Sequence, residues 1–168
     1  MIYVVQISST PEPVTSLIDR MLTGSAQETA SMVWLDRLEE QIELAGQRFQ
    51  EIVGGAERLM AMARETETAD LDEPIGILED LEERLGADLR SLRSDQERWA
   101  TLLWRNPPAI QHRFSSLIRH HEENLVRAAE AIRDVRWRLL GLQARTDDEG
   151  DAPAFDDPDA LERYLGTR

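Results

Sequence analysis

The stretch that decides the fold runs from Asn106 to Arg145 and reads NPPAIQHRFSSLIRHHEENLVRAAEAIRDVRWRLLGLQAR. Its apolar residues recur at steps of three or four, which places them on one narrow stripe of a helix of roughly ten turns. Asn106 can cap this helix, and Pro107 and Pro108 fit its first turn, where no backbone N–H is needed. The stripe consists of Ile110, Phe114, Leu117, His121, Leu125, Ala128, Ile132, Val135, Leu139 and Leu142.

Two earlier segments carry helical stripes of the same kind. The first follows Ser25, whose spacing to Glu28 matches a capping box, and its steps alternate between three and four as in a coiled coil until about Glu65. The second begins at Pro74, and the short corner at Asn106 makes it an antiparallel neighbour of the helix that follows. The two stripes are Leu35, Leu38, Ile42, Ala45, Phe49, Ile52, Ala56, Leu59 and Ala63, and then Leu78, Leu81, Leu85, Leu89, Leu92, Gln96, Trp99 and Leu103.

Shorter elements flank these helices. Residues 2–7 are β-branched and aromatic and predict an extended arm, which can pack on the helices, pair with its copy in a dimer, or join a partner's sheet. Residues 10–22 predict a short helix that ends at Gly24. Residues 146–157 predict an acidic linker, and residues 158–165 a final short helix that either folds back or orders on a partner.

Together these patterns predict an all-α fold. We expect an up-down-up bundle of three long coiled-coil-like helices, with short flanking helices and one N-terminal extended arm. The predicted divisions are residues 1–24 for the arm and first short helix, 25–145 for the bundle, and 146–168 for the acidic linker and last helix. Within the bundle the helices span about residues 25–65, 74–104 and 107–145.

Composition narrows the classes of function. The 168 residues include no cysteine, which excludes disulfides, zinc–thiolate sites and a thiol nucleophile. No run approaches 18 apolar residues, and no basic region precedes the apolar residues 2–7. We therefore expect a cytoplasmic protein with no membrane association.

The formal net charge is −14, and all 19 basic residues are arginine. An acidic surface does not neutralise phosphates, so general nucleic-acid binding is not expected. The segment 107–145 nevertheless has seven arginines against four acids, a net charge of +3. These arginines can pair with the acid-rich first and second helices. The alternative is a nucleic-acid-related role, either as an acidic DNA mimic or as a small subunit that contacts nucleic acid through this arginine-rich helix.

Side chains with catalytic or metal-binding chemistry are few. His112, His120, His121, Glu122 and Glu123 form the one cluster of metal-capable residues, and further ligands would have to come from the acids of the preceding helix. No nucleophile elbow and no glycine-rich phosphate loop is present. We predict no catalytic residues, no metal and no cofactor, with an enzyme or metal-binding bundle built on residues 112–123 as a third hypothesis.

His121 has a separate interpretation because it lies on the apolar stripe. Burial favours the neutral imidazole, so protonation near pH 6 would weaken the helix packing at this point. A carboxylate partner across the stripe would reverse that sign. The sequence therefore predicts a pH-sensitive core position.

Trp137 lies off the stripe, on a second and thinner one with Val126, Ala129 and Leu140, and Arg133 lies in its path. Val53 and Met60 form a similar off-stripe pair on the first long helix, and we interpret the two off-stripe groups together as a homodimer or partner surface. A large amphipathic side chain beside the core is a typical interface anchor. We predict an interaction protein without enzymatic activity (an adaptor, chaperone-like factor, inhibitor or assembly subunit) whose partner is another protein or a second copy in a homodimer. The predicted partner-binding residues are Trp137, Leu140, Val126, Arg133, Phe155, Leu161, Tyr164 and Leu165.

Overall fold

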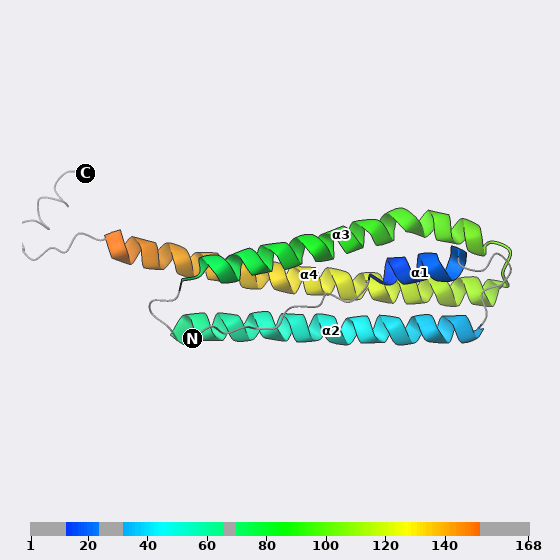
Figure 1. The fold of residues 1–168 in the computed structure, drawn as a ribbon, viewed down its shortest axis with the longest axis horizontal. Helices are drawn as coiled ribbons and strands as arrows, with labels where there is room; N and C mark the ends of the chain where they lie inside the picture. The colour runs from blue at the N-terminus through cyan, green and yellow to red at the C-terminus, as the bar shows by residue number, and fades with distance from the viewer. Residues whose placement is uncertain (1–12, 24–31, 66–69, 152–168) are drawn as a thin grey trace, which may run out of the picture.

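The computed structural model of the protein describes residues 13–23, 32–65 and 70–151. All regular structure among these residues is helical: α1 (Val14–Thr23), α2 (Met32–Glu65), α3 (Asp72–Leu103) and α4 (Pro108–Asp151) (Figure 1). The predicted all-α class is confirmed. The predicted arm at residues 2–7, the capping box at Ser25 and the last short helix at residues 158–165 lie outside the described residues. None of the described helices is long and apolar enough to cross a membrane.

Helix α4 is the centre of the packing. It lies along both α2 and α3, whereas α1 packs against α2 and α3 beside the half of the molecule nearest the α3–α4 corner (Figure 1). Trp34 of α2 stacks on Phe114 of α4, and Phe49 stacks on His121, so α2 and α4 run in the same direction. Helix α3 ends at that corner, and α4 leaves it in the opposite direction alongside α3 (Figure 1).

The core is formed by the stripes on the three long helices. On α4 the predicted stripe is buried except for Leu142, which is half-buried. Ile118 and Ala129 are buried as well, although they lie off the stripe, because α4 contacts two helices and therefore buries a wider face. Met60 of α2 is also buried, at 6% exposure, and Val53 is half-buried against the core. The prediction that Met60 lies on a partner surface is therefore wrong.

The corner between α3 and α4 differs from the prediction in one detail. The side chain of Asn106 does not cap α4: its Nδ2 donates to the carbonyl of Leu103 at 3.3 Å, and its backbone N–H donates to the same oxygen at 2.9 Å. Asn106 thus donates hydrogen bonds to the end of α3, where the last backbone carbonyls have no partner within the helix. Pro108 is the first residue of α4, where proline is favoured. Gln111 closes the corner by donating to the carbonyl of Asn106 at 2.7 Å.

Helix α4 continues to Asp151, six residues beyond the predicted end at Arg145. The sequence 146–151 lacks an apolar stripe, which favoured the prediction of a linker. It contains no proline, however, and acidic residues have acceptable helix propensity. A helix already formed by tertiary packing adds residues at little cost, because only nucleation is expensive.

Helix α1 begins at Val14, later than the predicted start at residue 10. Val14 and Ile18 are buried, at 5% and 0% exposure. In the middle of the helix, Asp19 Oδ1 accepts hydrogen bonds from the indole Nε1 of Trp99 at 2.8 Å and from Nη2 of Arg98 at 2.7 Å. Because Trp99 is completely buried, α1 supplies the hydrogen bond that its indole N–H needs.

Candidate interaction surfaces

Trp137 lies on the outer side of α4 and is 61% exposed. The guanidinium of the preceding Arg136 lies over its ring at 5.5 Å from the centroid. One turn further along, Gly141 is exposed, and a Cβ at this position would have no neighbouring atom within 4 Å. The indole therefore stands beside open surface and not in a packed crevice of its own chain.

The residues predicted to accompany Trp137 do not form one apolar surface with it. Leu140 is half-buried and packs against the core, and Arg133 is bound to Glu82 of α3, with its Nε donating to Oε1 at 2.7 Å. Val126 lies eleven residues away, about 16 Å along the helix axis. It lines a charged depression of its own, together with Glu122, Glu123, Arg127 and Glu130. The predicted residues Phe155, Leu161, Tyr164 and Leu165 lie outside the described residues.

A second group of exposed apolar residues lies at the corner end of the molecule. Trp104 follows the last residue of α3 and is 63% exposed, and Leu102 is 47% exposed. Met32 and Val33, at the start of α2 and at the same end in Figure 1, are 51% and 61% exposed. The sequence prediction missed this group. The sequence feature that could have indicated it is Trp104, a large aromatic side chain placed off the α3 stripe and two residues before Asn106-Pro107.

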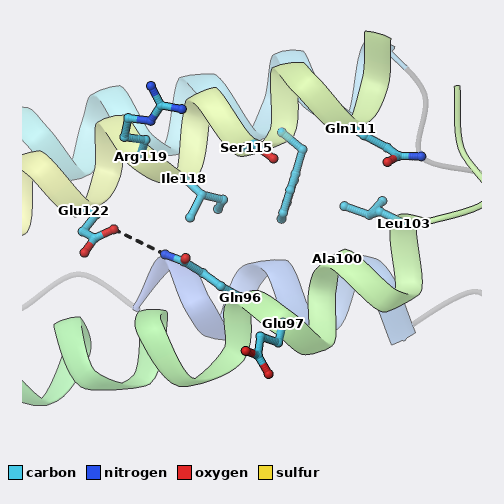
Figure 2. A pocket seen from close by; sticks show the side chains of 10 residues that line it. Gln96, Glu97, Ala100, Leu103, Gln111, Ser115, Ile118, Arg119 and Glu122 are labelled. Carbon is cyan, nitrogen blue, oxygen red and sulfur yellow. Dashed lines mark hydrogen bonds between the residues drawn. The ribbon is translucent and has the colours of Figure 1, made fainter. Parts of the chain in front are cut away.

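A groove of about 420 Å³ opens between α3 and α4 beside this corner (Figure 2). Its apolar walls are formed by Ala100, Leu103, Phe114 and Ile118. Polar side chains line the rest, and one of them, Gln96, points toward Glu122 across the groove (Figure 2). Its Nε2 donates to Oε2 at 3.4 Å, while Arg93 Nε binds the other carboxylate oxygen at 2.7 Å. The groove has room for one or two apolar side chains of a partner.

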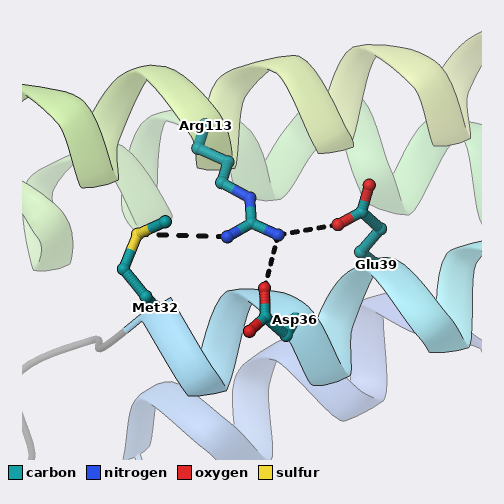
Figure 3. A network of polar contacts seen from close by, with 4 residues as sticks. All are labelled: Met32, Asp36, Glu39 and Arg113. Carbon is teal, nitrogen blue, oxygen red and sulfur yellow. Dashed lines mark hydrogen bonds and ion pairs between the residues drawn. The ribbon is translucent and has the colours of Figure 1, made fainter.

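The arginines of α4 bind acids of the neighbouring helices. Arg113 reaches α2, where one nitrogen, Nη2, binds Asp36 at 2.6 Å and Glu39 at 2.7 Å, and its Nη1 lies 3.9 Å from the sulfur of Met32 (Figure 3). These two hydrogen bonds raise the pKa of Arg113, so its charge is fixed. The arginine charge of this helix is thus directed, in part, toward its own bundle.

The same holds on the α3 side. Arg136 binds Glu79 at 3.2 Å and Glu82 at 2.9 Å, and Arg133 shares Glu82. Among the described residues, Arg119, Arg127 and Arg145 have no ion pair. They lie within about 80° of one another around the helix, but successive members are about 12 and 27 Å apart along its axis. The described part of α4 therefore presents no continuous strip of unpaired arginines.

The histidine cluster does not converge on a metal-like geometry. Across the residues that the structure describes, no group of three or more His, Asp or Glu side chains is arranged to hold a metal ion. His120 is exposed, and its Nε2 lies 3.4 Å from Nδ2 of Asn124 on the next turn.

His121 is buried, with 3% exposure, and stacks against Phe49 at 6.1 Å between ring centroids. Its Nδ1 is buried and has no hydrogen-bond partner. Burial, and secondarily the charge of His120, lowers the pKa of His121 to about 4. The neutral imidazole is the form that fits this site.

Comparison with protein-family models, with curated proteins and with solved structures gave no match for this chain.

Proposed function

We propose that this chain is an interaction protein without enzymatic activity, which holds two contacts at separate points of one elongated helical body. The observation that carries the proposal is the pair of exposed tryptophans, Trp104 at the corner and Trp137 on the outer side of α4. Gln111 Nε2 donates to the carbonyl of Trp104 at 3.0 Å, which fixes Trp104 near residue 111 of α4. Trp137 is 26 residues further along the helix, about 39 Å away.

The two tryptophans differ from the other two of the chain. Trp99 is fully buried and Trp34 is half-buried in a stack on Phe114, so both have structural roles. Trp104 and Trp137 are each covered on one face by a neighbouring arginine, at 5.1 and 5.5 Å, and are otherwise exposed. Tryptophan and arginine side chains together are enriched at the energetic centres of protein interfaces. This supports an adaptor or assembly role over a single-site inhibitor.

The groove beside Trp104 supports a contact at the corner. Its apolar walls end next to Leu102 and Trp104, so a partner's apolar side chain in the groove would lie beside the exposed indole. Of its two acids, Glu122 is engaged by Arg93 and Gln96. A carboxylate held in this way is a poor general base, which favours binding over catalysis here.

The test uses four tagged proteins: the natural chain, Trp104→Ala, Trp137→Ala and Glu130→Ala. Glu130 is exposed and lies seven residues before Trp137 on the same side of α4, so it is the matched control. Partners are captured from the native host, produced as pure proteins, and their affinities measured by calorimetry. Self-association of each variant is followed by sedimentation velocity, because the homodimer is the other form of this proposal.

We expect each tryptophan substitution to weaken one partner, or the dimer, about 30-fold or more, the loss that removal of an interface anchor causes. Glu130→Ala should bind like the natural chain. The proposal is wrong if both tryptophan variants stay folded and keep every partner and the self-association of the natural chain at unchanged affinity.

We also propose that α2, α3 and α4 form an up-down-up bundle with coiled-coil-like packing between α2 and α4. The alternation of three- and four-residue steps is regular on the α2 stripe and is interrupted once, at His121, on the α4 stripe. It supports this arrangement, since that spacing interlocks side chains of neighbouring helices. The nucleic-acid alternative is supported by the charge of −14 alone and gains no further support from the arginines of α4. A cytoplasmic location likewise remains part of the proposal.

A further inference from the structure

Helix α1 forms the roof of a small cavity in the middle of the bundle. The cavity has a volume of about 20 Å³, enough for one water molecule. All four helices contribute to it, with His121 as the contribution of α4. Its lining is Pro13, just before α1, Val14 and Thr15 from α1, Ala45, Phe49 and Ile52 from α2, Leu81, Arg84, Leu85 and Asp88 from α3, and His121.

The imidazole of His121 is the polar group left unsatisfied in this place. Its Nδ1 is buried without a hydrogen-bond partner, and the whole residue is 3% exposed. The lining residues of α1 and α2 carry no charge. One face of the ring is stacked on Phe49 and Nδ1 has no hydrogen-bond partner, so the surroundings as they stand suit a neutral ring.

The basic groups around the cavity also oppose protonation of His121. From α3, Arg84 adds a like charge at the cavity wall, and from α4 itself His120 lies next in the chain. The remaining group, Asp88 of α3, is half-buried, burial raises its pKa, and no hydrogen bond or ion pair joins its carboxyl group to His121. The protonated imidazole of His121 is therefore tolerated once water enters the cavity.

We propose that α1 is an acid-released lid: protonation of His121 undocks α1 from the groove between α2 and α3 while α2, α3 and α4 stay packed. Helix α1 is the element that can leave at low cost, because it has ten residues and α4 packs on α2 and α3 without it. Its departure opens the roof at Val14 and Thr15. It also breaks the hydrogen bond from Trp99 to Asp19 and bares the groove that Ile18 fills. This proposal is independent of the contacts at Trp104 and Trp137.

The size of the effect follows from linkage. Burial lowers the pKa of His121 to about 4 with α1 docked, whereas a solvated histidine titrates near its usual value of 6.5. The docking equilibrium should therefore fall as pH falls below 6.5, by up to about 30-fold at pH 5. Above pH 7 it should not change.

The experiment uses the cysteine-free chain, in which introduced cysteines are the sole labelling sites. Ser16→Cys on α1 and Ser91→Cys on α3, both exposed, carry one pair of spin labels. Ser94→Cys on α3 and Ser116→Cys on α4, also exposed, carry the control pair. Distance distributions are recorded by pulsed dipolar EPR at pH 8, 6.5 and 5, each in the natural background and with His121→Leu or His121→Gln.

We expect a narrow α1–α3 distribution at pH 8 that gains a broad, long component at pH 5, while the α3–α4 distribution stays narrow. With His121→Leu or His121→Gln the α1–α3 distribution should remain the same at both pH values. Two variants are used so that one poorly folded protein does not decide the result. The proposal is overturned if α1 stays docked at pH 5, if both label pairs broaden together, or if α1 is released equally without His121.

Discussion

Ile132 and Trp137 lie five residues apart on α4 and have opposite surroundings. Ile132 is fully buried, and Trp137 is 61% exposed. Ile132→Ala should lower the free energy of unfolding by about 2–5 kcal/mol, because it leaves a cavity in the core. Trp137→Ala should change it by less than about 0.5 kcal/mol, although it removes more atoms. Urea unfolding followed by far-UV circular dichroism measures both, and equal losses would mean that Trp137 packs against its own chain.

The pH dependence of stability at His121 has a defined sign. In the folded chain burial lowers the pKa of His121 to about 4, against 6.5 in the unfolded chain. Between these values the unfolded chain binds more protons than the folded chain. The free energy of unfolding therefore has its full value above pH 6.5 and decreases as the pH falls toward 4. The loss should be up to about 2 kcal/mol at pH 5.

The measurement is the difference between the natural chain and His121→Leu in urea unfolding at pH 8 and pH 5. Burial raises the pKa of Asp88, so this group works in the opposite direction, but it is present in both proteins and cancels in the difference. We expect the natural chain to lose stability relative to His121→Leu on acidification. If the stability difference between the natural chain and His121→Leu is the same at pH 8 and pH 5, the pH dependence does not come from His121.

The single glycines of the helices allow a sharp test of local packing. A Cβ at Gly141 of α4 or Gly76 of α3 would meet no atom within 4 Å, whereas at Gly46 of α2 it would approach Nδ2 of Asn124 to 3.1 Å. Gly141→Ala and Gly76→Ala should each raise the free energy of unfolding by about 1 kcal/mol, since alanine favours the helix. Gly46→Ala should gain less, because Asn124 must shift.

Thermal unfolding at fixed pH ranks the three variants. A stabilised Gly141→Ala that still binds its partners would show that the open surface beside Trp137 is not used for close backbone contact. Loss of binding with a gain of stability would show that it is.

The long helices could be predicted from the sequence because their apolar spacing is regular over many turns. The same spacing places Trp137 off the stripe, where the structure leaves it exposed. Met60 was misassigned because a single stripe describes a helix with one neighbour, and the core between these helices is wider. The end of α4 was missed because residues 146–151 have no apolar pattern, and helix continuation there depends on the turns already formed.

The position of α1 could not be predicted either. Its ten residues have an apolar face that would suit many grooves, and its site is defined by contacts distant in sequence, such as Asp19 with Trp99. The cavity at His121 depends on that position. Sequence reasoning identified the histidine, but Asp88 and Arg84 join it through tertiary packing alone.

Across the whole molecule, the uneven charge of the chain is partly balanced from within. The arginine-rich α4 lies between two acid-rich helices and binds Asp36 and Glu39 on one side and Glu79 and Glu82 on the other. These pairs select which helices lie side by side, since a like-charged neighbour would be repelled. The chain as a whole keeps a net charge of −14, which favours solubility.

The corner at Asn106 also fixes an order of folding. It joins α3 and α4 so closely that their contacts bridge short stretches of chain: Arg93 and Glu122 are 29 residues apart, whereas Arg113 and Asp36 are 77 apart. Closing the shorter loop costs less entropy, so the α3–α4 hairpin should form in the transition state and α2 should dock afterwards. Stopped-flow chevrons should show Leu92→Ala slowing refolding and Leu38→Ala mainly speeding unfolding, both residues being fully buried. On the ribosome α2 is made first, so it must wait unpaired, with its apolar stripe exposed, until the hairpin emerges.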